Sequence, residues 1–383
     1  MNFTGKKIAI IGANEYQNRL ILKAKELGIE THVFSWGGGE AGELNADNFY
    51  QVDVTKRQEI FEKCKLLKVD GVCSIASDLT NLTVNYIREK LGHIKNSNDC
   101  LELTTNKYLM REALKAGGSP IPYYQIAKKN QNLIELCHFP YIVKPIDRSG
   151  SRGVNLVHNF DQLQKAVKES IEESFLSESI IEEFIEGDEY SIESYSKNGS
   201  HFILQITKKY TTGAPRFIER AHLAPAFIDS KLEEKIKQVV SKALTNLKVE
   251  FGSSHSEIKI NEAGEIKIIE IGSRMGGDFI GSDLVIQNTK VDFLRLEIMN
   301  ALGQDVSDSE LSGDKEIESI ISVIFSFDEK HYNQVQELFC YKIIDTAVNE
   351  NYSGNVLSSS ERYGYHIIKV PNSEIMKIKQ VCQ

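Results

Sequence analysis

The chain has 383 residues, 41% of them hydrophobic, which is enough for two or three domains with sizeable cores. Its net charge of −9 at pH 7 argues against nucleic acid as the main partner, and no apolar run is long enough to suggest a membrane segment. The six cysteines show no CxxC spacing and no signal peptide is evident, so we expect reduced thiols and a cytoplasmic protein.

The first hundred residues alternate between strand and helix patterns. A buried strand at residues 6–12 is followed by apolar residues at helical spacing over 17–27, and the alternation then continues. This order predicts a parallel, Rossmann-like sheet. Ligands gather at the carboxyl ends of such strands, so four polar residues there are candidates for substrate or domain contacts, with turn and helix-capping roles as the alternative. They are Asn14, Gln17, Ser77 and Asp78.

The segment FPYIVKPIDRSGSRGV, residues 139–154, predicts a strand, a mobile loop and a second strand. Lys144 closes the apolar run, and a loop rich in glycine and serine follows it. Glycine lets the backbone approach a polyphosphate, while Ser hydroxyls and Lys and Arg charges add donors. An ordinary flexible hairpin is the alternative, and the spacing does not match the GxxxxGK[ST] P-loop.

Residues 179–194 carry an acidic turn between two apolar stretches. A nucleobase needs one backbone donor and one acceptor, which Glu183 and Ile185 would supply, and a ribose needs a carboxylate such as Glu189. An amphipathic strand with an acidic turn is the alternative interpretation.

Glu257 and Glu270 lie on two strand patterns separated by a turn at residues 261–264. A four-residue hairpin loop would place 257 opposite 268, so the two carboxylates would share one face as diagonal neighbours, with Cβ atoms roughly 7–8 Å apart. Such a pair suits divalent cations. His255 and Lys259 share this face and are candidates for phosphate or substrate contacts, although a charged solvent-exposed edge is the alternative.

Taken in order, these motifs resemble the ATP-grasp superfamily. The resemblance is closest to the branch with carbamoyl-phosphate-synthetase-like, biotin-carboxylase-like and phosphoribosylglycinamide-synthetase-like members, which includes amino-acid ligases. It implies an α/β fold with a Rossmann-like domain at residues 1–103, an ATP-grasp domain at 104–302 and a small β-rich lobe at 303–383. It rests on Asn106-Lys107, Ile142-Val143-Lys144-Pro145, the SGSRG loop, Glu182 to Ile185, Glu189, Glu257, Glu270 and Arg274.

The resemblance also implies roles for individual residues. Phosphates and the purine edge would contact Lys107 and Lys144, and Mg²⁺, or Mn²⁺, would bind Glu257 and Glu270. Arg274 and Lys144 would be catalytic. The lid over the triphosphate would comprise Ser149, Gly150, Ser151, Gly153 and Val154, adenine would lie against Glu182, Glu183 and Ile185, and ribose against Glu189.

Glycine occupies three positions close to Arg274, namely 272, 276 and 277. Many family members carry asparagine where this chain has Gly272, so Ser273, water or substrate would have to complete a second metal site. The glycine-rich loop at Gly276 and Gly277 would shape the acceptor pocket, with a plain turn as the alternative.

The implied activity is ATP-dependent ligation of a small carboxylic acid, such as an amino acid, to an amine through an acyl phosphate, with release of ADP and phosphate. A phosphoribosylglycinamide-synthetase-like or carboxyphosphate-forming ligase is the alternative within enzymes, and a non-catalytic nucleotide sensor is the alternative of another class. The expected partners are the small-molecule carboxylate and amine, with a homodimer compatible with the family, and neither nucleic acid nor membrane.

Overall fold

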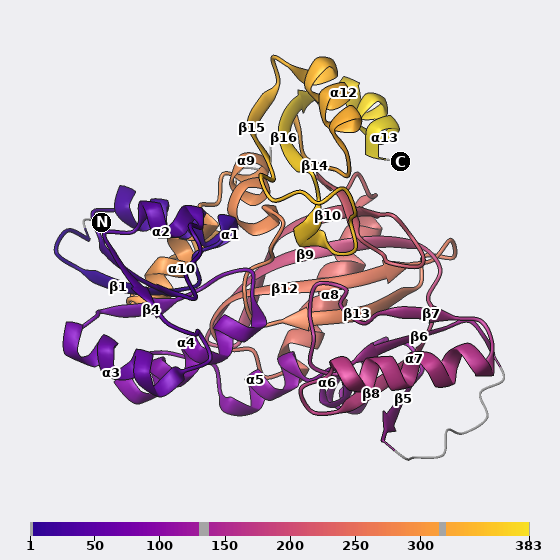
Figure 1. Ribbon diagram of the computed structural model, residues 1–383, viewed down its shortest axis with the longest axis horizontal. Helices are drawn as coiled ribbons and strands as arrows, with labels where there is room; N and C mark the ends of the chain where they lie inside the picture. Colours follow the sequence, from indigo (N-terminus) through magenta and orange to yellow (C-terminus); the bar gives the residue numbers. More distant parts are fainter. Residues whose placement is uncertain (1–2, 130–137, 314–318, 383) are drawn as a thin grey trace.

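Three β-sheets organise the chain in the computed structural model, which describes residues 3–129, 138–313 and 319–382 (Figure 1). A parallel sheet has the strand order β3-β2-β1-β4, an antiparallel sheet has the order β5-β8-β6-β7, and an eight-stranded antiparallel sheet has the order β13-β12-β9-β10-β11-β14-β16-β15. The predicted α/β architecture with a parallel N-terminal sheet is confirmed, and the large antiparallel sheet is a finding of the structure.

The parallel sheet is covered by helices on both faces. Ile8 and Ile10 of β1 pack with Leu20 of α1, whereas Ala9 and Ile11 face the opposite layer, because successive strand residues point to opposite sides. The strands are β1 (Lys7–Ile11), β2 (Glu30–Ser35), β3 (Asn48–Gln51) and β4 (Gly71–Cys73). The helices are α1 (Glu15–Glu26) and α10 (Phe293–Ala301) on one face, α3 (Arg57–Leu67) and α4 (Asp78–Leu91) on the other, and the short α2 (Ala41–Asn45).

The smaller antiparallel sheet lies at the lower right of Figure 1 and is covered by one helix, α7 (Phe160–Glu173). Leu163 of this amphipathic helix is fully buried in a core with Val143 and Ile181 of the sheet. The strands are β5 (Tyr124–Lys128), β6 (Tyr141–Pro145), β7 (Asn155–Val157) and β8 (Glu178–Glu183), and α5 (Asn98–Thr105) and α6 (Lys107–Ala116) precede them.

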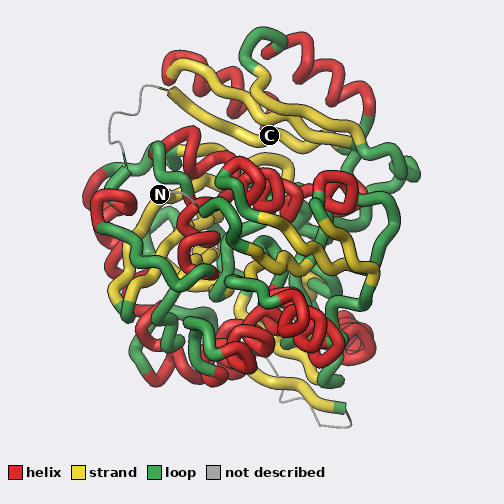
Figure 2. The backbone as a smooth tube through the Cα atoms, turned by 90° about the vertical axis from the view of Figure 1, so that its left-hand side faces the viewer, coloured by secondary structure: helices red, strands yellow, loops and turns green. Residues whose placement is uncertain are grey.

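The eight-stranded sheet runs through the middle of the molecule and into its C-terminal part (Figure 2). Helix α8 (Ser230–Asn246) is amphipathic, and its Ile236, Val240 and Ala243 pack in one core with β12 and β13. The strands are β9 (Asp188–Lys197), β10 (Ser200–Thr211), β11 (Glu219–Ala224), β12 (Gly252–Ile260), β13 (Ile266–Gly272), β14 (Ser319–Ser326), β15 (Ile343–Val348) and β16 (Gly364–Pro371). Helices α12 (Glu329–Phe339) and α13 (Ile375–Cys382) cover the last of these.

Contacts cross both of the domain boundaries expected from the sequence. Helix α10 lies within the range expected for the ATP-grasp domain but packs on the parallel sheet of the N-terminal domain. Strand β14 lies within the range expected for the C-terminal lobe but pairs with β11. The three-domain division therefore stays a prediction. Among the described residues, no helix combines the length and the apolar character needed to cross a membrane.

Candidate active site

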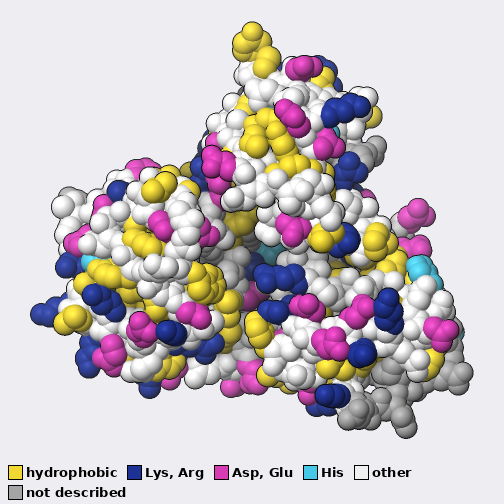
Figure 3. All heavy atoms as spheres, viewed as in Figure 1, with side chains coloured by type: hydrophobic (Ala, Val, Ile, Leu, Met, Phe, Trp, Pro, Cys, Tyr) yellow, Lys and Arg dark blue, Asp and Glu magenta, His cyan; other side chains and the backbone are white. Residues whose placement is uncertain are grey.

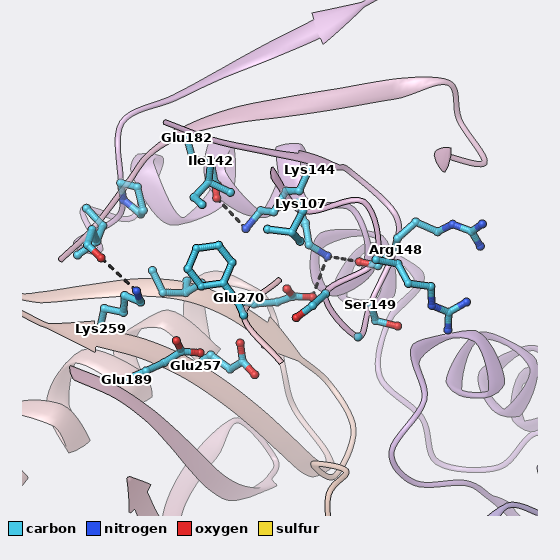
Figure 4. Close-up of a pocket in the computed structure, with 18 of the residues that line it drawn as sticks. Lys107, Ile142, Lys144, Arg148, Ser149, Glu182, Glu189, Glu257, Lys259 and Glu270 are labelled. Carbon is cyan, nitrogen blue, oxygen red and sulfur yellow. Dashed lines mark hydrogen bonds and ion pairs between the residues drawn. The ribbon is translucent and has the colours of Figure 1, made fainter. Parts of the chain in front are cut away.

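A cleft between the β5–β8 sheet and the eight-stranded sheet brings together most of the residues singled out from the sequence (Figure 4). Figure 3 shows the surface hollowed where the parts of the molecule meet, with Lys and Arg side chains beside the hollow. The singled-out residues that line the cleft are Lys107, Lys144, Ser149, Gly150, Ser151, Val154, Glu182, Glu183, Ile185, Glu189, His255, Glu257, Lys259, Glu270 and Arg274.

Glu257 and Glu270 are direct partners across β12 and β13, so the predicted diagonal register is wrong although both side chains line the same cleft. The connecting loop is one residue longer than expected, because Ile260 pairs with Ile266. A bulge at Ile269 then adds a further residue to β13. The Nη2 of Arg111 donates to the carbonyl of Ile269 over 2.6 Å, which gives the bulged backbone a partner.

Cationic side chains already contact both carboxylates. Glu257 Oε1 lies 3.0 Å from Lys209 Nζ, and Glu270 Oε1 lies 2.9 Å from Lys107 Nζ. Burial alone would raise the pKa of Glu257, but Lys209 and His255 hold it well below its usual range. Burial likewise disfavours the charged form of Lys209, yet the carboxylates of Glu189, Glu257 and Glu219 raise its pKa well above the ordinary value. Glu257 and Lys209 are therefore both charged near neutral pH.

The carboxylate pair fits a magnesium ion. The described residues contain no cluster of three or more His, Cys, Asp or Glu side chains set to hold a metal. A metal site on Glu257 and Glu270 would thus need water and substrate oxygens as its other ligands, as is common for Mg²⁺ in proteins.

His255 lies behind this pair and joins it to the glycine-rich loop. Its Nδ1 is 2.5 Å from Glu193 Oε1 and its Nε2 is 3.4 Å from Glu257 Oε1. Burial lowers the pKa of His255, but the fully buried Glu193 outweighs it and raises the pKa to about 9. Glu193 also accepts the N–H of Gly276, where a Cβ would lie 2.4 Å from Glu193 Oε1. Gly276 and Gly277 are not among the residues that line the cleft.

Lys144 is held by Glu182 from β8. One Glu182 oxygen lies 2.7 Å from Lys144 Nζ and the other 2.6 Å from Arg111 Nε. Burial would raise the pKa of Glu182, but the two cations lower it to about 2. Both carboxylate oxygens are thus engaged by protein cations, although adenine had been expected to lie against this residue.

The segment from Glu183 to Ile185 and the glycine-serine loop at 148–154 border the same cleft. The Ile185 carbonyl accepts from Lys259 Nζ at 3.2 Å, and Glu183 accepts from the Tyr123 N–H at 3.1 Å. At the start of the loop, the Arg148 carbonyl accepts from Lys107 Nζ at 2.6 Å. Gly153 has φ +71°, and a Cβ there would lie 2.9 Å from Pro145 Cγ, so this loop position requires glycine.

Residues at the carboxyl ends of the parallel strands take mixed roles. Asn14 and Ser77 cap helices α1 and α4, and Gln17 donates to the Ile75 carbonyl. Asp78 instead contacts Arg274, with 2.7 Å between Oδ1 and Nε. The Ser273 hydroxyl lies 2.9 Å from that of Thr104. Whether Ser273, water or substrate completes a second metal site beside Gly272 stays a prediction.

The sequence interpretation missed four charged residues of this site: Arg111, Glu193, Lys209 and Glu219. Arg111 had a usable signal, because it lies four residues after Lys107 and therefore on the same helical face. Glu193 interrupts a strand that is otherwise largely buried, and Lys209 is itself buried in β10, which are unusual positions for charge. Their partners lie on other strands, so only the assembled sheet identifies them.

Residues 137–283 match a family model described as the ATP-grasp domain. Alanine–anticapsin ligase of Bacillus amyloliquefaciens is 28% identical over 263 residues, covering 61% of this chain and 50% of that protein. The chain spans about half the length of the first curated relatives that it matches.

Two solved structures match over nearly their whole length. L-amino acid ligase from Bacillus licheniformis has a TM-score of 0.82 at 20% identity, covering 99% of this chain and 97% of that one. N5-carboxyaminoimidazole synthetase from Staphylococcus aureus, complexed with ADP, has a TM-score of 0.78 at 17% identity, covering 100% and 99%. This chain therefore contains an ATP-grasp domain and has the fold of the ATP-grasp ligases.

Proposed function

We propose that this chain is an ATP-dependent carboxylate–amine ligase whose acid substrate is an amino acid or another small carboxylate. One observation carries the proposal: the direct Glu257–Glu270 pair, Lys107, Lys144 and Arg274 line one cleft together with the glycine-serine loop at 148–154. They come from four elements, α6, β6, β12 and β13, and from the loop after β13. Phosphoryl transfer needs positioned cations more than it needs covalent chemistry, and this cleft supplies them.

Nucleotide binding in this proposal follows the contacts of the cleft. The base lies against Ile142 and the backbone around Ile185, the ribose hydroxyls donate to Glu189, and Lys107 and Lys144 donate to the phosphates. Glu182 holds Lys144 in place, because its oxygens are already engaged by Lys144 and Arg111. Mg²⁺, or Mn²⁺, bound to Glu257 and Glu270 would offset the negative charge of the triphosphate.

The reaction has two steps. A carboxylate is a poor electrophile, so transfer of the γ-phosphoryl group of ATP to one of its oxygens forms an acyl phosphate and leaves ADP. The amine then attacks the carbonyl carbon, phosphate departs with the electrons of the C–O bond, and the amine loses a proton. Arg274 stabilises the transferred phosphoryl charge. The loop at 148–154 excludes water that would hydrolyse the acyl phosphate.

The test is to incubate the chain with Mg-ATP and pooled amino acids or other small carboxylates, and to follow phosphate release together with product mass. We expect release that depends on both an acid and an amine, with a product equal to their sum less water. Release that depends on bicarbonate instead would favour a carboxyphosphate-forming ligase. Tight ATP binding without release in any pool would favour a nucleotide sensor and would overturn the proposal.

A further inference from the structure

The start of helix α4, in the N-terminal part of the chain, holds the segment that carries Arg274. The Ala76 N–H donates to the carbonyl of Met275 at 3.1 Å. The Asn81 side-chain amide donates to the carbonyl of Ser273, also at 3.1 Å. The backbone on both sides of Arg274 is therefore fixed by residues nearly two hundred positions earlier in the chain.

The side chain of Arg274 is held by the same helix. Its Nε lies 2.7 Å from Asp78 Oδ1 and its Nη2 lies 3.3 Å from Asp78 Oδ2. The two side chains are only 13% and 18% exposed. A two-point contact between guanidinium and carboxylate fixes the plane of the guanidinium as well as its position. The third nitrogen donates to the carbonyl of Met275 at 3.2 Å.

Gly272 lies directly beside this ion pair. A Cβ at that position would lie 3.3 Å from Asp78 Oδ1, 3.4 Å from Arg274 Cζ and 3.5 Å from Arg274 Nε. Gly272 ends strand β13 and does not have a positive φ, so the backbone conformation itself is open to any residue. Space, and not backbone freedom, is what glycine provides here.

We propose that Asp78 is a positioning residue for Arg274, and that residue 272 is glycine because the Asp78–Arg274 pair fills the space into which a side chain there would project. The inference rests on the proposed function, in which Arg274 acts on the transferred phosphoryl group. In place of a polar side chain at 272, the chain would then have the guanidinium of Arg274 held by Asp78 from the N-terminal part. A clamp of this kind spares the enzyme from ordering a long side chain in each turnover.

Two substitutions at each position test this in the full chain. Asp78→Asn keeps the size but removes the charge, and should lower kcat for substrate-dependent phosphate release by about tenfold or more, while KM for ATP stays within about twofold. Asp78→Glu should recover part of that loss. Gly272→Asn, which restores the residue common in the family, should lower kcat to a similar extent, whereas Gly272→Ala should have a mild effect.

The double variant gives the decisive comparison. If residue 272 acts through the ion pair, Asp78→Ala combined with Gly272→Asn should be no slower than Asp78→Ala alone. Wild-type kcat in Asp78→Asn, or fully additive losses in the double variant, would overturn the inference. An equal fall in activity and in folded fraction would also overturn it, because that result indicates a purely structural contact.

Urea unfolding of the wild type, Asp78→Ala, Gly272→Asn and the double variant separates this inference from the proposed function. The loss of stability from Gly272→Asn should be smaller in the Asp78→Ala background than in the wild type, and this readout needs no turnover. If the wild type releases no phosphate from any pool but the unfolding data show this coupling, the ligase proposal fails while the packing of Gly272 against the ion pair stands. If the unfolding effects are additive, the inference fails regardless of activity.

Discussion

The ammonium group of Lys144 lies 2.7 Å from a carboxylate oxygen of Glu182, although the two residues are not opposite each other in the sheet. Lys144 pairs with Ile180, and Glu182 pairs with Ile142, so the two side chains are diagonal neighbours on β6 and β8. Both are almost fully buried, with 7% and 4% of the side chain exposed. Lys144 therefore cannot swing away without leaving a buried carboxylate short of one partner.

Glu182→Gln should weaken nucleotide binding, because the glutamine no longer holds Lys144 electrostatically in the cleft. We expect the dissociation constant of a fluorescent ATP analogue to rise about tenfold, the scale of one lost charge-assisted hydrogen bond. Glu178→Gln is the matched control on the same strand, since Glu178 pairs with the half-exposed Lys128 and should leave binding unchanged. Equal affinities in the two variants would contradict the positioning role of Glu182.

The same substitution predicts a pH dependence of stability. The pKa of Glu182 is lowered from 4.5 to about 2 in the folded chain. The carboxylate thus stabilises the fold at pH values above 4.5 and loses this contribution as the pH falls towards 2. The difference in unfolding free energy between wild type and Glu182→Gln should therefore be widest near neutral pH and should shrink in acid. Urea unfolding at a series of pH values measures it, and a constant difference would refute the assignment.

Glu270→Gln should lower turnover by about 10²-fold or more, the scale for losing one transition-state stabiliser, and should raise the Mg²⁺ concentration needed for half-maximal rate. The fold should persist, because glutamine can still accept a hydrogen bond from Lys107 at the position of Oε1. Glu262→Gln, at the exposed tip of the same hairpin, is the control and should match wild type. Wild-type magnesium dependence in Glu270→Gln would remove Glu270 from the metal site.

The fold could be predicted from the sequence because its signals are local. Strand and helix periods alternate cleanly in the first hundred residues, and the apolar stripe of α8 is carried by Ile236, Val240 and Ala243. The expected shared face of Glu257 and Glu270 also holds, but the expected register does not. A bulge at Ile269 adds one residue to β13, and no feature of the hairpin sequence marks it.

The charge network of the cleft could not be predicted from the sequence. Lys209 lies 2.9 Å from Glu189 and 3.0 Å from Glu257, yet these three residues come from three different strands. The pairing of Asp78 with Arg274 likewise joins elements 196 positions apart. Which charged side chains meet depends on the strand order and on how the N-terminal part packs against the large sheet. Local periodicity predicts neither of these.

Lys209→Met tests the charge network directly. Lys209 is the shared cation of three carboxylates and its side chain is only 6% exposed, so its removal leaves Glu189, Glu219 and Glu257 close together without the cation that joins them. We expect the free energy of unfolding to fall by about 3–5 kcal/mol, as for other buried ion pairs that lose one partner. Lys208→Met removes the neighbouring charge, which pairs instead with Asp188, and should cost much less. Equal costs measured by urea unfolding would show that the three carboxylates do not depend on Lys209.

The glycine-serine loop should close over the nucleotide, and its two glycines should differ in how much that closure depends on them. Gly150 and Gly153 both have positive φ, so alanine strains the backbone at either position. Only at Gly153 would the added Cβ also meet another residue, at 2.9 Å from Pro145 Cγ, whereas nothing lies within 4 Å at Gly150. Gly153→Ala should therefore impair closure more than Gly150→Ala.

Limited trypsin digestion can follow this closure, because Arg152 is exposed within the loop. Mg-ATP should slow cleavage after Arg152 in the wild type and in Gly150→Ala, and should protect Gly153→Ala markedly less at saturating nucleotide. Saturation must be established for each variant by titration, so that weak binding is not mistaken for poor closure. Equal protection of all three proteins would mean that the packing of Gly153 against Pro145 does not shape the closed loop, and cleavage unaffected by Mg-ATP in the wild type would show that the loop is not a lid.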